Sequence, residues 1–93
     1  MSANSGEGLF TGLILVTSES NPNIEAKIKE VLAPFTIKIM DTQSMDIRGR
    51  YFLTILFSLD KAHANAIQDD LEAVAKTIEV DLVVDYQYLQ GAN

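Results

Sequence analysis

Apolar residues recur along this chain with two different spacings, and the spacing predicts the type of each element. Four stretches alternate or are apolar throughout, which predicts strands, because successive side chains of a strand point to opposite faces of its sheet. These stretches are 9–17, 36–46, 51–59 and 80–89. Spacing of three and four residues predicts one helix at 22–33 and a second from Asp60, a suitable N-cap, to about Thr77. The predicted order is β-α-β-β-α-β.

The strands differ in which of their faces are apolar, and this difference predicts their order in the sheet. The first and third strands are apolar on both faces, as expected of central strands that are covered on both sides. The second and fourth carry polar residues such as Lys38 and Asp85, which is typical of edge strands. The order 4-1-3-2 follows. It is the antiparallel four-stranded sheet of the ferredoxin-like βαββαβ sandwich, an α+β fold with two helices on one face.

The face of this sheet away from the helices is also predicted to be apolar. Phe52 and Leu56 of the third strand fall on it, and we expect Gly12 of the first strand beside them, where another group can approach closely. Monomers rarely leave a large contiguous apolar area open to water. We therefore expect a partner surface there or along an edge strand.

Turn-forming and helix-ending residues separate the predicted elements. Gly49 precedes the third strand and is expected to take a positive φ in a tight hairpin turn. Asn21 is the predicted N-cap of the first helix, with Pro22 at its first helical position. Pro34 is predicted to end that helix by moving Ala33 out of the helical region.

Length and composition indicate one packed domain. The chain has 93 residues, of which 47% are hydrophobic, and this suits a single core better than a disordered tail. Residues 1–8 are small and polar and are predicted to form a flexible N-terminal arm, which leaves a single domain at 9–90. No apolar run reaches the roughly 18 residues of a membrane span, and the arm lacks the pattern of a signal peptide. We therefore expect a cytoplasmic protein with no membrane partner.

Charge and rare residue types narrow the possible chemistry. The formal net charge of −6 opposes binding to nucleic acid, which needs clustered Lys and Arg. Residues 48–55 half-match an RNA-recognition motif, but aromatic residues of that motif are missing. The chain has no cysteine and one histidine, which excludes disulfides and thiolate zinc sites. We expect no cofactor, no metal and no nucleic-acid partner.

The sequence contains no recognisable set of catalytic side chains. An acylphosphatase-like site needs a Gly-rich loop with an arginine after the first strand, and 18–23 has neither. Asp85 follows an apolar run, as the nucleophile of a haloacid-dehalogenase phosphatase does, but it lacks a second carboxylate as acid–base partner. It is predicted to be an edge-strand surface residue, and His63 to lie on the exposed surface of the second helix. We therefore expect no catalytic residues in this chain.

The loop at 18–23 joins a buried strand to the start of a helix. Free N–H groups and the positive end of the helix dipole make such a corner suitable for a carboxylate. A simple capped turn explains the same residues equally well. Both interpretations are compatible with the residues alone.

Two segments carry a resemblance to a known family. They are Val16-Thr17 followed by SESNPNI, and Ile47-Arg48-Gly49-Arg50 leading into the third strand. With these segments the chain resembles the ACT domain, a small regulatory module that binds amino acids. It is most similar to the N-terminal regulatory ACT domain of phosphoserine phosphatases of serine biosynthesis, over roughly Leu13 to Val84.

The resemblance implies a homodimer formed through a second ACT domain, by sheet extension or helix packing. It also implies a small amino-acid ligand such as serine, bound at the corner after the first strand. The ligand-binding residues carried over are Ser20, Asn21, Pro22, Asn23 and Ile24. The chain would then be a fragment of a phosphatase whose catalytic domain is absent. A stand-alone ACT-like assembly or sensor module without phosphatase activity is the alternative.

Overall fold

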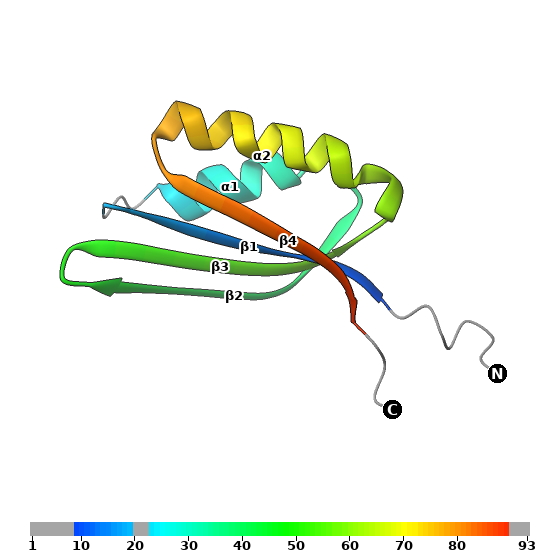
Figure 1. Ribbon diagram of the computed structural model, residues 1–93, viewed down its shortest axis with the longest axis horizontal. Helices are drawn as coiled ribbons and strands as arrows, with labels where there is room; N and C mark the ends of the chain where they lie inside the picture. The colour runs from blue at the N-terminus through cyan, green and yellow to red at the C-terminus, as the bar shows by residue number, and fades with distance from the viewer. Residues whose placement is uncertain (1–8, 20–22, 90–93) are drawn as a thin grey trace.

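The computed structural model describes residues 9–19 and 23–89 and confirms the predicted order of elements. The strands and helices are β1 (Leu9–Glu19), α1 (Ile24–Leu32), β2 (Ile37–Ile47), β3 (Arg50–Leu59), the short 3-10 helix η1 (Lys61–His63), α2 (Ala64–Ile78) and β4 (Asp81–Leu89). The sheet order is β2-β3-β1-β4, and all neighbouring strands are antiparallel. Both helices lie over one face of the sheet (Figure 1). The ferredoxin-like prediction is therefore confirmed.

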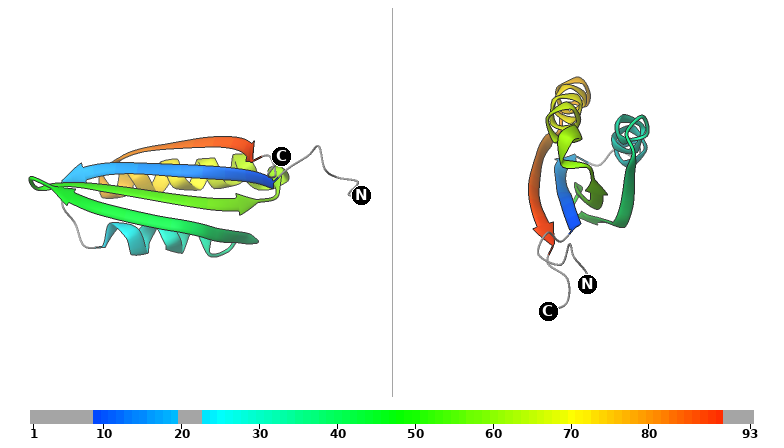
Figure 2. Two further views of the ribbon diagram at one scale, coloured as in Figure 1. Left: turned by 90° about the horizontal axis from the view of Figure 1, so that it is seen from below. Right: turned by 90° about the vertical axis from the view of Figure 1, so that its right-hand side faces the viewer.

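The core lies between the helices and the sheet. Alternation along β1 and β3 buries one side chain in two, so that the cross-strand partners Ile14 and Ile55 both face the helices. Figure 2 shows the two helices side by side over this face, with the opposite face of the sheet uncovered. The fully buried large apolar side chains are Ile14, Val16, Ile24, Ile28, Leu32, Leu53, Ile55, Phe57, Ile67 and Leu71. Each contributes roughly 1.5–3 kcal/mol before conformational entropy is subtracted.

The face of the sheet that points away from the helices, called the open face below, is partly apolar as predicted. Phe52 and Leu56 lie on it and are partly exposed, because the alternate residues Leu53 and Phe57 face the helices. Gly12 does not lie on the open face. It pairs with the buried Phe57, and cross-strand partners share a face. The predicted position of Gly12 was wrong because β1 is apolar on both faces, so the sequence does not define which residues face the helices.

The predicted close approach at Gly12 is nevertheless confirmed. A Cβ atom at this position would lie 2.8 and 2.9 Å from two ring carbons of Phe57 and 3.1 Å from the ring of Tyr86. The two aromatic rings therefore occupy the space that any side chain on β1 would need at this point.

A two-residue turn connects β2 to β3. Ile47 pairs with Arg50, and both residues between them have positive φ, 53° at Arg48 and 82° at Gly49. These angles are those of a type I′ hairpin, whose twist matches that of the flanking strands. The positive φ predicted for Gly49 is confirmed.

Helix α1 differs from its prediction at both ends. It begins at Ile24 with Asn23 at the N-cap, so the prediction of Asn21 as N-cap was wrong; Asn21 and Pro22 lie outside the described residues. Ala33 keeps helical angles, φ −57° and ψ −37°, so the prediction that Pro34 would move it out of the helical region was also wrong. The helix ends there because Pro34 has no N–H group with which to continue the hydrogen-bond ladder.

The second helical segment starts with a tighter turn than predicted. Asp60 acts as an N-cap, and its Oδ1 accepts a hydrogen bond of 2.9 Å from the N–H of Ala62. That cap begins η1, and α2 follows at Ala64, so the predicted single helix is a 3-10 turn that continues into an α-helix. Short 3-10 turns are frequent at helix N-termini because one tight turn satisfies otherwise unpaired N–H groups.

Candidate functional site

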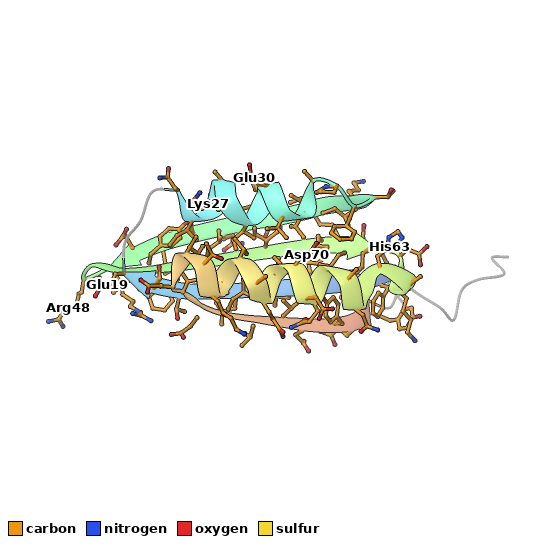
Figure 3. The ribbon with its side chains drawn as sticks, turned by 90° about the horizontal axis from the view of Figure 1, so that it is seen from above. Glu19, Lys27, Glu30, Arg48, His63 and Asp70 are labelled. Atoms are coloured by element: carbon orange, nitrogen blue, oxygen red, sulfur yellow. The ribbon has the colours of Figure 1, made fainter. Side chains whose placement is uncertain are left out.

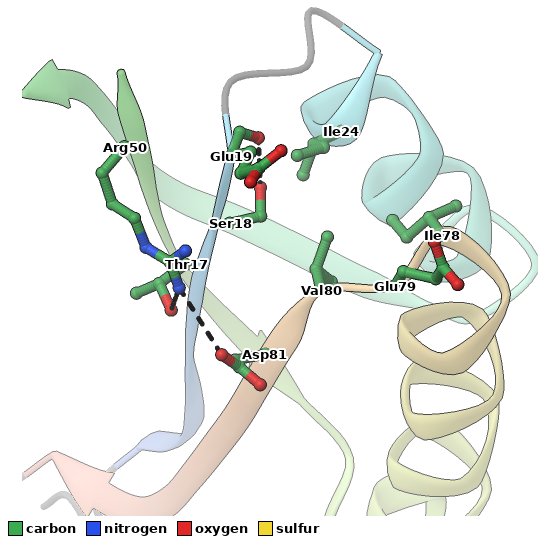
Figure 4. A pocket seen from close by; sticks show the side chains of 9 residues that line it. All are labelled: Thr17, Ser18, Glu19, Ile24, Arg50, Ile78, Glu79, Val80 and Asp81. Atoms are coloured by element: carbon green, nitrogen blue, oxygen red, sulfur yellow. Dashed lines mark hydrogen bonds and ion pairs between the residues drawn. The ribbon is translucent and has the colours of Figure 1, made fainter. Parts of the chain in front are cut away.

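The corner between β1 and α1 lies at the end of the sheet where β3 and β4 begin. Ser20, Asn21 and Pro22 of the predicted ligand-binding set lie outside the described residues. Asn23 is the N-cap of α1 and Ile24 its first residue. Ile24 lies near Ser18 and Glu19 at the end of β1 (Figure 4).

A hollow of about 470 Å³ opens at this end of the molecule. This volume lies within the range of small-molecule sites, which is roughly 300–1,000 Å³. Its walls come from β1, α1, β3, β4, the end of α2 and the turn between α2 and β4. They are lined by Thr17, Ser18, Glu19, Ile24, Arg50, Ile78, Glu79, Val80 and Asp81. The hollow therefore includes residues on both sides of the predicted ligand-binding loop.

One part of the hollow is charged. Nη2 of Arg50 donates a hydrogen bond of 3.2 Å to Oγ1 of Thr17 and lies 3.5 Å from Oδ2 of Asp81 (Figure 4). The side chains of Arg50 and Asp81 are 45% and 86% exposed, and an exposed pair of this kind contributes about 0.2–1 kcal/mol. A stronger anionic partner can therefore replace Asp81 at the guanidinium with little loss of stability.

The other part of the hollow is apolar. Figure 4 shows Ile24 and Ile78, from the facing ends of α1 and α2, on the side of β1 away from Arg50. Ile24 is buried, and so is Ser18, whose Oγ donates a hydrogen bond of 2.7 Å to the carbonyl of Glu19. An apolar wall beside charged groups is the arrangement that orients a small amphipathic ligand.

The carboxylates outnumber the cations around the hollow. Glu19, Glu79 and Asp81 contribute three negative charges, against the one positive charge of Arg50. Glu79 follows α2 and has φ 59°, in the left-handed region that non-glycine residues seldom adopt. The next N–H group, of Val80, donates to the carbonyl of Ala75 over 3.0 Å, which closes the helix end. The lining offers partners both for an ammonium group and for a carboxylate.

The start of α1 adds a further electrostatic contribution. Lys27 is the first residue of this helix whose N–H bonds back along the helix, to the carbonyl of Asn23 over 3.0 Å. The N–H groups before it belong to the positive end of the helix dipole, which favours negative charge at the corner. The carboxylate interpretation of the loop is therefore compatible with the described residues around it.

Sequence reasoning confined the site to a single loop and missed Arg50, Glu79 and Asp81. Arg50 begins β3, far in the sequence from Glu79, which follows α2, and from Asp81, which begins β4. The predicted strand order contained the missing signal, because antiparallel neighbours of β1 must begin where β1 ends. The register confirms this, since Glu19 pairs with Arg50 and Thr17 with Asp81.

Two other residues considered from the sequence lie away from the hollow. Asp85 is exposed on the edge strand β4, as predicted. His63 is not on an exposed helix surface: it is half-buried in η1, with its ring 6.1 Å from that of Phe35. Its Nδ1 is buried and has no hydrogen-bond partner among the described residues. Across residues 9–19 and 23–89, no group of acidic and histidine side chains is arranged to hold a metal ion.

The fold is that of a small α+β module, a four-stranded antiparallel sheet with two helices on one face. The family model described as the ACT domain matches residues 12–85. The chain belongs to the ACT domain family, whose members are regulatory domains. No helix in the described part of the chain is long and apolar enough to cross a membrane.

One curated relative is phosphoserine phosphatase SerB2 of Mycobacterium tuberculosis, 32% identical over 75 residues. The match covers 78% of this chain but 18% of that phosphatase, so the chain spans less than a fifth of the relative's length.

Solved structures share the fold at low identity. An ACT domain protein from Streptococcus pneumoniae has a TM-score of 0.74 at 16% identity, covering 85% of this chain and 91% of that protein. A putative glycine cleavage system transcriptional repressor has a TM-score of 0.79 at 14% identity, covering 88% of this chain and 49% of that one. A formyltetrahydrofolate deformylase from Burkholderia mallei has a TM-score of 0.72 at 13% identity, covering 81% of this chain and 27% of that one. These likenesses show the fold alone.

Proposed function

We propose that this chain is a regulatory, dimerising ACT domain that binds a small amino acid at the hollow beside the β1–α1 corner. We propose further that it belongs to a phosphoserine phosphatase of serine biosynthesis and acts in the cytoplasm. The observation that carries the ligand proposal is the meeting of Arg50, three carboxylates and an apolar wall in one hollow. The guanidinium suits the ligand carboxylate, because Arg presents a fork of donors to such groups. A carboxylate of the lining suits its ammonium group.

Dimerisation is proposed through β2 and the neighbouring flank of α1. β2 is an edge of the sheet, and Ile39 and Met40 on it are exposed. A second hollow, of about 360 Å³, lies between β2 and α1 and is mainly apolar. It is lined by Lys29, Leu32, Ala33, Phe35, Ile37 and Ile39. An edge strand offers unpaired backbone groups to another strand, so a second ACT domain can extend the sheet there.

Calorimetric titration of the chain with each of the twenty amino acids tests the ligand proposal. We expect serine or another small amino acid to bind, with affinity lowered at least tenfold in Asn21→Ala and in Arg50→Gln. The matched controls are Asn65→Ala, on the exposed side of α2, and Arg48→Gln, at the hairpin tip (Figure 3). Both controls should bind like the parent. Absence of heat from all twenty amino acids would refute ligand binding and leave assembly as the role.

The relation to a phosphatase rests on the similarity to SerB2. The gene downstream of residue 93 tests it. An apolar strand ending in Asp-x-Asp-x-Thr would support a phosphatase, because that pattern supplies the nucleophile and its acid–base partner. A stop codon at that place would instead support the alternative of a stand-alone ACT-like sensor or assembly module.

A further inference from the structure

The open face of the sheet carries most of the exposed apolar surface of the described residues. Ten large apolar side chains are exposed among them, and seven belong to this face by the strand register. The seven are Leu9, Leu13, Leu15, Met45, Ile47, Val83 and Leu89. An antiparallel sheet with one face in water usually carries polar residues there. The open face instead has the apolar pattern of a sheet face that packs against another protein surface.

The distribution of charge across the open face resembles the anatomy of an interface. Its centre, on β1 and β3, is uncharged and contains Leu13, Leu15, Phe52, Thr54 and Leu56. The charged residues lie around this centre, on the two edge strands, at the end of β1 and at the start of β3. They are Glu19, Lys38, Asp41, Arg50, Asp81 and Asp85. An apolar centre with a polar rim is typical of protein–protein interfaces.

The size of the face suits association of two copies. Four strands at about 4.8 Å spacing and nine residues at about 3.4 Å each give a footprint of roughly 600 Å². Stable interfaces bury about 600–1,000 Å² on each partner. A second sheet of the same dimensions covers the whole face, whereas a single helix or strand would leave most of it in water.

We propose that the open face is an interface between two copies of this chain, packed sheet on sheet about a two-fold axis that runs between β1 and β3. Leu13 and Leu56 are cross-strand partners on either side of this axis, so each lies over the other residue of the second copy. Packed antiparallel sheets lie about 10 Å apart, which lets such side chains interdigitate. This interface is separate from the β2 edge, and it does not depend on a ligand.

The two-fold axis also places the cation Arg50 of one copy over the carboxylate of Glu19 in the other, because these two residues are cross-strand partners on either side of the axis. It places the β2–β3 half of one copy over the β1–β4 half of the other. The cations Lys38 and Arg50 lie on the first half, and Asp81 and Asp85 lie on β4 in the second. Asp41 is the exception on the first half, because it lies level with Leu56, Leu13 and Asp85 and therefore falls over Asp85 of the other copy, at the rim of the interface.

A matched pair of variants separates this interface from the β2 edge. Leu15 on the open face and Met40 on β2 are 40% and 41% exposed, so Leu15→Lys and Met40→Lys introduce the same charge at the same exposure. By sedimentation at micromolar concentrations, we expect Leu15→Lys to weaken face-to-face association at least tenfold and Met40→Lys to leave it intact. If Leu15→Lys assembles like the parent, or if the parent is a monomer throughout, the proposal is wrong.

Crosslinking provides a second measurement that does not require disruption of the face. The chain has no cysteine, so Thr54→Cys introduces one thiol, near the proposed axis. A short bismaleimide that spans about 10 Å, the separation of packed sheets, should link two copies. The control Asp70→Cys places the thiol on α2, on the helix side of the molecule (Figure 3), and should not link.

Crosslinking also identifies other occupants of the face. If the thiol of the Thr54→Cys variant reacts with a monofunctional maleimide but forms no crosslinked pair, the face is free in solution and the proposal is overturned. If that thiol reacts with neither reagent, another part of the same chain covers the face, and the proposal is equally overturned. Circular dichroism of each variant establishes that the comparison is made on folded protein.

Discussion

Replacing Gly12 with alanine tests the packing of β1 beneath the helices. The new methyl group would lie 2.8 and 2.9 Å from ring carbons of Phe57 and 3.1 Å from the ring of Tyr86. Phe57 is fully buried and cannot turn aside without displacing the core. Overpacking of this kind costs about 1–3 kcal/mol, and alanine in a strand recovers about 0.5–1 kcal/mol of backbone entropy. We expect Gly12→Ala to lower the free energy of unfolding by about 1–2 kcal/mol.

Denaturant unfolding at one fixed protein concentration measures this effect, because association would add to the apparent stability. The double variant Gly12→Ala/Phe57→Leu identifies the cause. Leucine removes the ring carbons nearest the new methyl group, so Gly12→Ala should cost far less in that background than in the parent. The same cost in both backgrounds, or a Gly12→Ala variant as stable as the parent, would refute the close approach.

Gly49→Ala is the control for glycine replacement in general. A Cβ there meets nothing within 4 Å among the described residues, but the residue has φ +82°. Its cost, about 1 kcal/mol, should arise from the backbone. Replacement of Phe57 by leucine should therefore leave that cost unchanged.

Two further predictions concern single contacts. Asp60→Ala removes the hydrogen bond to the N–H of Ala62 and should lower the free energy of unfolding by about 1 kcal/mol. The control Asp69→Ala, on the exposed side of α2, should leave the free energy of unfolding unchanged. Equal effects of the two substitutions would contradict the role of Asp60 as an N-cap. Burial, and secondly the charge of Glu72, raise the pKa of Tyr86 above 10.0. The stability that this shift contributes is present below the unfolded pKa and is lost as pH rises through the folded pKa. Spectrophotometric titration should show the tyrosine pKa falling in Glu72→Gln, and an unchanged titration would show that Glu72 has no influence.

Strand order was predictable from the sequence because two strands are apolar on both faces and two are not. Which side chains of β1 face the helices was not predictable for the same reason. Because both faces of this strand are apolar, nothing in the strand itself shows that Gly12 lies under the helices. Pairing with Phe57 decides it, and that is a tertiary contact. Ala33 shows a second limit, because the steric preference before a proline is weak enough for one helical residue to persist there.

The candidate site was predictable in part. The sequence located the corner after β1 because that corner is a local feature of a strand, a loop and a helix start. Arg50 and Asp81 were assigned to a hairpin and to an edge strand, although the predicted topology already brought both to the end of β1. Their contact with each other at 3.5 Å depends on side-chain direction, which residue spacing does not determine.

The two edges of the sheet are unlike each other, and this difference limits how copies of the chain can polymerise. The register of β2 against β3 shifts between Ile39 and Asp41, so a bulge interrupts that edge, while β4 carries Asp81 and Asp85. Head-to-tail joining of β2 to β4 would leave a free edge at each end and grow into a fibre without limit. The bulge changes the local twist of β2 and the carboxylates charge β4, so these two edges are poorly matched to each other. Head-to-tail growth is thereby disfavoured, whereas closed assemblies with a fixed number of subunits, such as two copies joined through their β2 edges, remain accessible.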